Sequence, residues 1–127
     1  MMNYLLVFVG AGLGGVARHG IGSTFLKMAG QGGFPFATLA INIVGSLLIG
    51  ALVVLVSQYS GLPRHTQLFL ATGVLGGFTT FSTFSLETVL LLHRGQLMAA
   101  TMYVLVSIIA AVGGLAWVMH LAKFKMA

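Results

Sequence analysis

Acidic side chains are almost absent from this sequence of 127 residues, in which Glu87 is the one Asp or Glu against six Lys and Arg. A single carboxylate excludes the paired carboxylates of general acid–base catalysis and the carboxylate cages that bind hard metal ions. Cysteine is absent as well, which excludes disulfides, thiolate metal sites and cysteine nucleophiles. The six basic residues are scattered singly and make no nucleic-acid patch. The sequence therefore predicts a protein that is not an enzyme.

Charge of either sign is scarce, since charged residues make up 6% of the chain and hydrophobic residues 58%, whereas soluble domains are about 25% charged. A helix needs roughly 20 apolar residues to cross a bilayer core about 30 Å thick. Four stretches are long enough, at about residues 4–27, 35–59, 63–93 and 97–121. The first is too long for a signal peptide and has no Lys or Arg before it. We predict an all-α membrane protein in which residues 1–127 form a single transmembrane domain of four transmembrane helices.

The basic residues between the spans are nearly balanced. With both termini on one side, that side carries Arg64, Lys123 and Lys125, and the other carries Lys27 and Arg94. Such a balance gives almost no preference under the positive-inside rule. Either the chain inserts in both orientations, or a partner sets its orientation. We favour insertion in both orientations, which would make an antiparallel, dual-topology homodimer the natural assembly.

The third span contains two adjacent glycines, Gly76 and Gly77, followed by hydroxyl and β-branched residues. Glycine weakens a helix, and unwound backbone at membrane depth is stable only where it lines a cavity or is buried in protein. We predict a break in the helix at these glycines and the run that follows them, with carbonyl groups suited to a cation and N–H groups suited to an anion. The alternative is a continuous helix whose glycines permit close packing.

Aromatic and hydroxyl side chains alternate directly after the glycines. Phe78, Phe81 and Phe84 recur every three residues and are expected near one face of a helix, with Ser82 and Thr83 between them. Because ring edges carry partial positive charge, ring edges and hydroxyls together could replace part of the hydration of an anion. Core packing is the other interpretation of the same stripe.

Other polar side chains within the spans allow functional and structural interpretations. Asn42 is the one amide deep in a span and either lines water or bonds another helix. Tyr103 and Ser107 are four residues apart in the fourth span and could continue a polar face. Arg18, inside the first span, either draws anions toward a vestibule or caps carbonyls of a neighbour. Glu87 either pairs with a base or faces water.

Small residues recur one helical turn apart, which allows helix backbones to approach closely. The pairs are Gly10 and Gly14, Gly73 and Gly77, and Ser46 and Gly50. They predict tight packing within the chain and between subunits. The histidines show no metal-ligand spacing and are predicted to lie at the membrane interface: His19, His65, His93 and His120.

The run from Gly76 to Ser85, followed by Glu87, resembles the signature of the Fluc (CrcB) fluoride channels. The resemblance covers the whole chain. It includes a glycine-rich first span with an arginine, here Gly10 through Arg18, and the stretch Pro-Phe-Ala-Thr-Leu-Ala-Ile-Asn that brings in Asn42. It implies a passive, fluoride-selective channel in the cell inner membrane that exports fluoride entering cells as HF. It also implies an antiparallel homodimer with two pores.

The resemblance further implies a structural sodium ion at the dimer centre, bound by backbone carbonyls of Gly76 and Thr79 from both subunits and not transported. The pore residues that it implies are two phenylalanines, an asparagine and a track of hydroxyls, here Phe81, Phe84, Asn42, Ser82, Thr83, Tyr103 and Ser107. Ala111 departs from relatives with serine at that position, which would either shorten the track or leave water to supplement it.

Two other functions remain open from the residues. A small proton-coupled efflux transporter could also have four helices and dual topology, with Glu87 as its titratable carboxylate. The position of Glu87 toward the end of its span weakens this alternative. A non-transporting assembly subunit would use its polar run for packing against a partner and would show no flux by itself.

Overall fold

The computed structural model describes residues 1–59 and 61–125, and every regular element in these ranges is helical. Four helices are long and apolar enough to cross a membrane, which confirms the predicted all-helical membrane fold. The first, second and fourth spans are continuous, and the third is divided into four elements. In chain order the elements are α1 (Met2–Ala29), α2 (Phe36–Gln58), α3 (Arg64–Gln67), η1 (Leu68–Leu75), α4 (Gly76–Phe78), α5 (Phe81–His93) and α6 (Leu97–Leu121).

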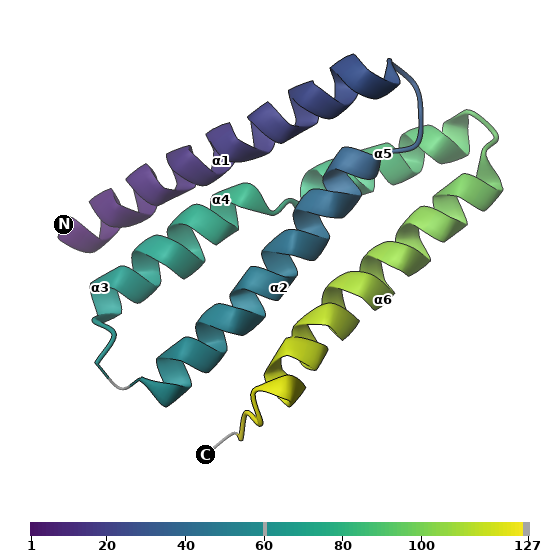
Figure 1. Cartoon of the computed structure of the whole chain (residues 1–127). Coiled ribbons are helices and arrows are strands. Elements are labelled where there is room, and N and C mark those ends of the chain that lie inside the picture. Colours follow the sequence, from purple (N-terminus) through teal and green to yellow (C-terminus); the bar gives the residue numbers. More distant parts are fainter. Residues whose placement is uncertain (60, 126–127) are drawn as a thin grey trace.

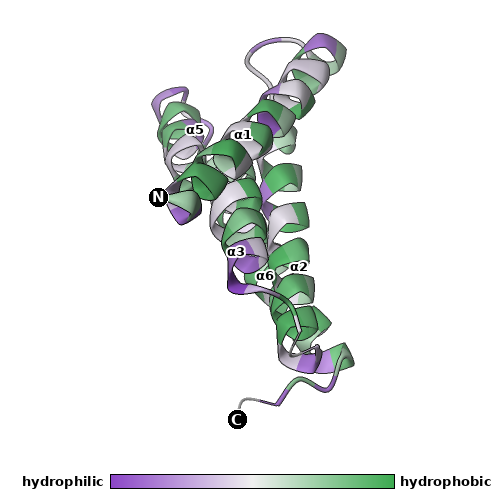
Figure 2. Cartoon of the chain, turned by 90° about the vertical axis from the view of Figure 1, so that its left-hand side faces the viewer, coloured by the Kyte–Doolittle hydropathy of each residue, from purple (hydrophilic) through white to green (hydrophobic). Residues whose placement is uncertain are grey.

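The four spans alternate in direction, so α1 runs parallel to the third span and α2 runs parallel to α6 (Figure 1). The most extensive packing joins α1 to η1 and α4, and α2 to α6. Figure 2 shows hydrophobic residues along the helices and hydrophilic residues gathered mainly near the helix ends and connections. This distribution is that of a protein whose outer surface faces hydrocarbon rather than water.

Two of the predicted small-residue pairs meet each other. A Cβ added to Gly10 would lie 2.7 Å from the Phe69 carbonyl oxygen, and one added to Gly14 would collide with the Val74 carbonyl. Gly77 in turn lies against the backbone of Ala11. The glycines therefore let α1 touch the backbone of the third span, as close packing in a membrane requires.

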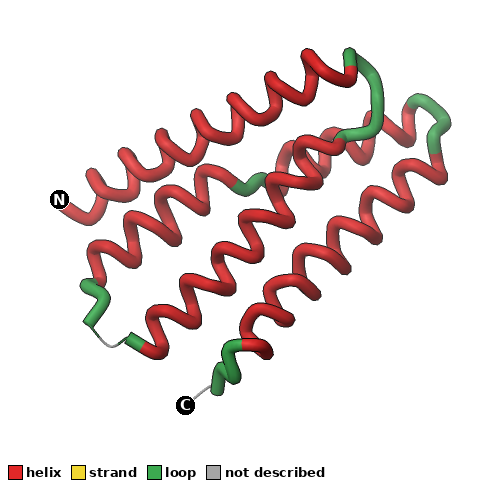
Figure 3. The backbone as a smooth tube through the Cα atoms, viewed as in Figure 1, coloured by secondary structure: helices red, strands yellow, loops and turns green. Residues whose placement is uncertain are grey.

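η1 is a π-helix, whose wider turns occur mostly as short insertions in α-helices near functional sites. It spans Leu68–Leu75 and leads directly into the short helix α4. The chain then leaves the helical conformation, visible as the loop that divides the third span in Figure 3. The irregular backbone in the middle of this span positions the candidate site.

Candidate functional site

The helix of the third span is interrupted at Thr79 and Thr80, which are both extended, with φ/ψ of −78°/156° and −152°/119°. The predicted break is present, but it does not fall at Gly76 and Gly77. Both glycines remain helical, and Gly77 packs against the backbone of Ala11 in α1. The helix is instead interrupted two residues later, at β-branched threonines, which favour extended backbone.

Asn42 of α2 pairs with both backbone groups of Thr80. Its Nδ2 donates to the Thr80 carbonyl at 3.0 Å, and its Oδ1 accepts from the Thr80 N–H at 2.9 Å. The side-chain amide thus replaces the two hydrogen bonds that Thr80 loses by leaving the helix. An unpaired backbone group costs several kcal/mol in hydrocarbon. Of the two interpretations of Asn42, the contact between helices is present, and one amide hydrogen remains for another partner.

The break leaves a set of backbone carbonyls without donors. Within the described residues, no hydrogen bond reaches the carbonyl oxygens of the four residues before Thr80, which are Gly76, Gly77, Phe78 and Thr79. In a continuous helix these oxygens would accept from the N–H groups four residues later. Carbonyl oxygens that are free at membrane depth are suited to a hard cation such as sodium. The backbone at Gly76 and Thr79 therefore fits the ion that the family resemblance implies.

On the other side of the break, α5 begins with a hydroxyl cluster. Thr80 is the N-cap residue, and its Oγ1 accepts from the Thr83 N–H at 3.2 Å. The same hydroxyl lies 3.1 Å from Thr83 Oγ1 and 3.3 Å from Ser82 Oγ. The backbone N–H groups of Phe81 and Ser82 have no hydrogen-bond acceptor in residues 1–59 and 61–125. Hydroxyls and N–H groups at a helix N-terminus are favourable to an anion.

Glu87 joins three helices. Its Oε1 accepts from the Thr38 hydroxyl of α2 at 2.9 Å, and its Oε2 accepts from the Tyr103 hydroxyl of α6 at 2.7 Å. In the described part of the chain, Glu87 makes no ion pair. Its carboxylate is therefore bound by two hydroxyl groups and not by a basic side chain. Thr38 is the residue that the sequence reasoning did not assign to a site. Its spacing of four residues from Asn42 was the available signal, since it places both on one face of α2.

The three phenylalanines do not share one face, because the break separates Phe78 from the other two. Phe78 is buried at the end of α4, whereas Phe81 is 79% exposed at the start of α5. Phe81 and Phe84 have ring centroids 5.6 Å apart, and Phe84 lies 5.1 Å from the ring of Tyr103. The expectation of a single stripe is therefore wrong for Phe78, while the other two rings form a pair.

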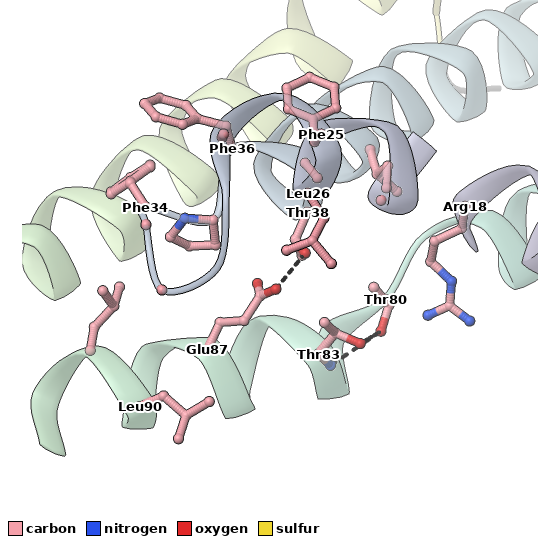
Figure 4. A pocket seen from close by; sticks show the side chains of 18 of the residues that line it. Arg18, Phe25, Leu26, Phe34, Phe36, Thr38, Thr80, Thr83, Glu87 and Leu90 are labelled. Carbon is pink, nitrogen blue, oxygen red and sulfur yellow. Dashed lines mark hydrogen bonds between the residues drawn. The ribbon is translucent and has the colours of Figure 1, made fainter. Parts of the chain in front are cut away.

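A cavity of about 710 Å³ opens between the end of α1, the start of α2 and α5. Its lining includes Arg18, His19, Thr80, Thr83, Glu87 and Arg94. Figure 4 shows Thr80 and Thr83 between Arg18 on one side and Glu87 on the other. Arg94 donates to the Gly32 carbonyl at 3.2 Å and so holds the loop at the mouth of the cavity. The cavity leads from the end of the bundle to the break.

The structure brings most of the predicted site residues together around the break. Asn42, Thr79, Ser82 and Thr83 are at the break itself, and Glu87, Phe84 and Tyr103 form one contact network next to it. Ser107 is buried on α6, and its hydroxyl is without a hydrogen-bond partner in the described residues. Ala111, one turn further along α6, is half-buried and adds no polar group.

Comparison with known proteins places this arrangement in a family. Residues 5–119 match the family model described as CrcB-like protein, Camphor Resistance (CrcB). The chain is 53% identical over 123 residues to the "Fluoride-specific ion channel FluC" of Granulibacter bethesdensis, covering 97% of this chain and 96% of the relative. It is 52% identical over 114 residues to the protein of the same name from Methylobacterium nodulans, covering 90% of each. A further relative of that name, from Agrobacterium fabrum, is 47% identical over 112 residues, covering 88% of this chain and 89% of the relative. The chain with its interrupted third span therefore belongs to the CrcB family.

Proposed function

We propose that this chain is a fluoride-selective channel that lets fluoride leave the cell passively. The observation that carries the proposal is the break in the third span, where a hydroxyl cluster and free N–H groups begin α5 at membrane depth. Relatives about 50% identical over about 90% or more of this chain carry the name of a fluoride-specific ion channel. Export across the cell inner membrane would lower the fluoride concentration in the cytoplasm.

The proposed pore must replace the water around a small, strongly hydrated anion. Burying a bare ion costs tens of kcal/mol by a Born estimate, so donors must line the whole path. Among the described residues, Asn42 keeps one amide hydrogen available, Ser82 and Thr83 supply hydroxyls, and Ser107 supplies a buried hydroxyl without a partner. The ring edges of Phe81 and Phe84 would add a modest positive field without a fixed cation that traps the ion.

The proposed assembly is an antiparallel homodimer with a structural sodium ion at its centre. The near balance of basic residues between the two ends supports insertion in both orientations. The carbonyls of Gly76 and Thr79 are free for a cation and would bind sodium together with the same groups of a second copy. Sodium would fix the two breaks against each other and would not be transported. The large apolar side chains exposed along the helices leave surface for both lipid and a second subunit.

A proton-coupled transporter remains the second candidate, because Glu87 lies within the span and lines the cavity. Fluoride efflux from liposomes that contain only the purified protein separates the two functions. A passive channel releases fluoride fast without a proton gradient and leaves chloride inside. Fluoride release that needs a proton gradient and is lost in Glu87→Gln would contradict the channel function and support the transporter. A folded dimer without any flux would instead support the assembly subunit.

A further inference from the structure

We propose that Asn42 sets the strength and direction of the Thr79 carbonyl as a cation ligand, acting through the peptide group between Thr79 and Thr80. Asn42 is then a positioning residue for the cation as well as a donor to the proposed pore. The inference rests on the proposed function, which supplies the sodium ion. It goes further in assigning a residue of α2, outside the broken span, to the cation site.

The geometry follows from one hydrogen bond. Asn42 Oδ1 accepts from the N–H of Thr80 at 2.9 Å, and that N–H belongs to the same planar peptide group as the Thr79 carbonyl. In a trans peptide the N–H and C=O point in opposite directions. The Thr79 carbonyl therefore points away from Asn42 and from α2. By binding the N–H on one side of this peptide group, Asn42 thus fixes the direction of the Thr79 carbonyl oxygen on the other side.

The same bond strengthens that oxygen as a ligand. Hydrogen bonds in a chain polarise one another at low dielectric, by an estimated 10–30% per bond. Acceptance of the Thr80 N–H by Asn42 shifts electron density of the peptide toward the Thr79 oxygen. The effect requires the acceptor atom of Asn42, because the donor atom of the amide contacts the next peptide group, at the Thr80 carbonyl.

Neighbouring contacts keep this peptide from rotating. The Thr79 hydroxyl donates to the Leu75 carbonyl at 2.9 Å, and Thr79 Cγ2 lies directly against Gly45, one turn of α2 after Asn42. The Asn42 amide in turn forms hydrogen bonds with both backbone groups of Thr80. With Thr79 held by its side chain and Thr80 by its backbone, the orientation of the carbonyl between them depends on α2.

Two substitutions divide the two roles of Asn42. Asn42→Leu is of similar size and removes both the acceptor and the donor, so it should weaken both sodium binding and fluoride flux. Asn42→Asp keeps an acceptor for the Thr80 N–H but places negative charge beside the proposed anion path. It should therefore abolish fluoride flux while it preserves sodium binding. Ser46, one turn further along α2, has no hydrogen bond to Thr80 among the described residues, so Ser46→Ala is the matched control.

Sodium binding is measured without fluoride, as the rise in unfolding temperature of the purified protein when sodium chloride replaces N-methyl-D-glucamine chloride at constant ionic strength. Ligand that binds only the folded protein stabilises it in proportion to the logarithm of its concentration, so a titration gives an apparent dissociation constant. We expect Asn42→Leu to raise this constant roughly tenfold, in line with the loss of one hydrogen bond of ordinary strength. Asn42→Asp and Ser46→Ala should stay within about threefold of the unmodified protein on the same scale.

Unchanged sodium binding in a folded Asn42→Leu variant overturns the inference. If that variant does not fold, Asn42→Asp decides, because loss of sodium binding in it shows that the acceptor is not sufficient. Absence of any sodium effect in the unmodified protein overturns the cation site together with this inference. Fluoride efflux, measured separately, then still decides whether the chain is a channel.

Discussion

The Tyr103 hydroxyl donates a 2.7 Å hydrogen bond to Oε2 of Glu87, which joins α6 to the second half of the third span. Tyr103 is fully buried and also contacts the rings of Phe84 and Phe34. One side chain therefore connects the single carboxylate of the protein to the phenylalanine pair at the break. Any change in how Glu87 is held is expected to reach the proposed pore through this ring.

Replacement of Tyr103 by phenylalanine should keep the packing and remove the hydrogen bond to Glu87. The half-buried carboxylate would lose one of its two hydroxyl partners, and a hydrogen bond to a charged group contributes about 1.5–3 kcal/mol. We expect a lower unfolding temperature in detergent and slower fluoride efflux. Tyr4→Phe, at an exposed ring at the start of α1, is the control and should change neither quantity. Equal behaviour of the two variants would contradict a role for this bond.

The contact between α1 and the third span predicts opposite results for two glycines on one helix. Gly14→Ala places a methyl group against the Val74 carbonyl and 2.7 Å from the Phe78 nitrogen, and overpacking of this kind costs about 1–3 kcal/mol. At Gly12 no heavy atom of the described residues lies within 4 Å of an added Cβ. Gly12→Ala should therefore stabilise α1 slightly, by up to about 1 kcal/mol.

Thermal unfolding and the yield of folded protein measure this difference. A Gly14→Ala variant as stable as Gly12→Ala would mean that the two helices lie further apart than the structure shows.

Gly45 controls the position of Thr79, because a Cβ at Gly45 would collide with Thr79 Cγ2. We expect Gly45→Ala to displace the break and to reduce fluoride efflux at least tenfold, the effect of about 1.4 kcal/mol on a barrier. The double variant with Thr79→Ser lacks the colliding methyl group and keeps the hydroxyl bonded to Leu75. It should recover most of the flux. No recovery would show that the collision is not the cause of the loss.

The two phenylalanines of the pair should respond differently to isoleucine, which is apolar but has no ring edge. Phe81 is 79% exposed, so Phe81→Ile should leave the unfolding temperature unchanged and reduce fluoride efflux if the ring edge contacts the ion. Phe84→Ile also removes the contact with Tyr103 and should lower both quantities. Unchanged efflux in a folded Phe81→Ile variant would favour a packing role for this ring.

Arg18 is expected to attract anions into the cavity, since it lines the cavity. Arg18→Gln should slow fluoride efflux severalfold at low ionic strength and less at high ionic strength, because salt screens charges that are exposed to water. Arg18→Lys keeps the charge and serves as the matched variant. The same reduction at every salt concentration, in both variants, would indicate a structural role.

The fold followed from the sequence because length and hydropathy act along each helix separately. The exact position of the break did not, since Gly76 and Gly77 satisfy the rule for unwinding and yet remain helical, with Gly77 packed against Ala11. Whether a glycine unwinds a helix or lets it pack closely against another helix depends on that neighbouring helix, which composition does not reveal. The helix is interrupted at the threonines because Asn42, 38 residues earlier, supplies the hydrogen-bond partners for the backbone of Thr80.

The site residues were predictable as a set but not in their contacts. Asn42 and Glu87 were each candidates for their polarity in an apolar span, while their partners depended on how α2, α5 and α6 meet. Thr38 lacked any motif and was recognisable only by its helical spacing from Asn42. Phe78 was misplaced because the spacing of three residues was applied across a segment that is not helical.

The pairing of Asn42 with Thr80 has a consequence for the biogenesis of the protein. A broken helix would enter the bilayer with unpaired backbone groups if it had to insert alone. Here the residue that pairs with the break lies in the preceding span, and chains are synthesised and folded from the N-terminus onward. Asn42 therefore leaves the ribosome before Thr80. Because α2 precedes the third span in the chain, the side chain that pairs with the break is made before the break itself.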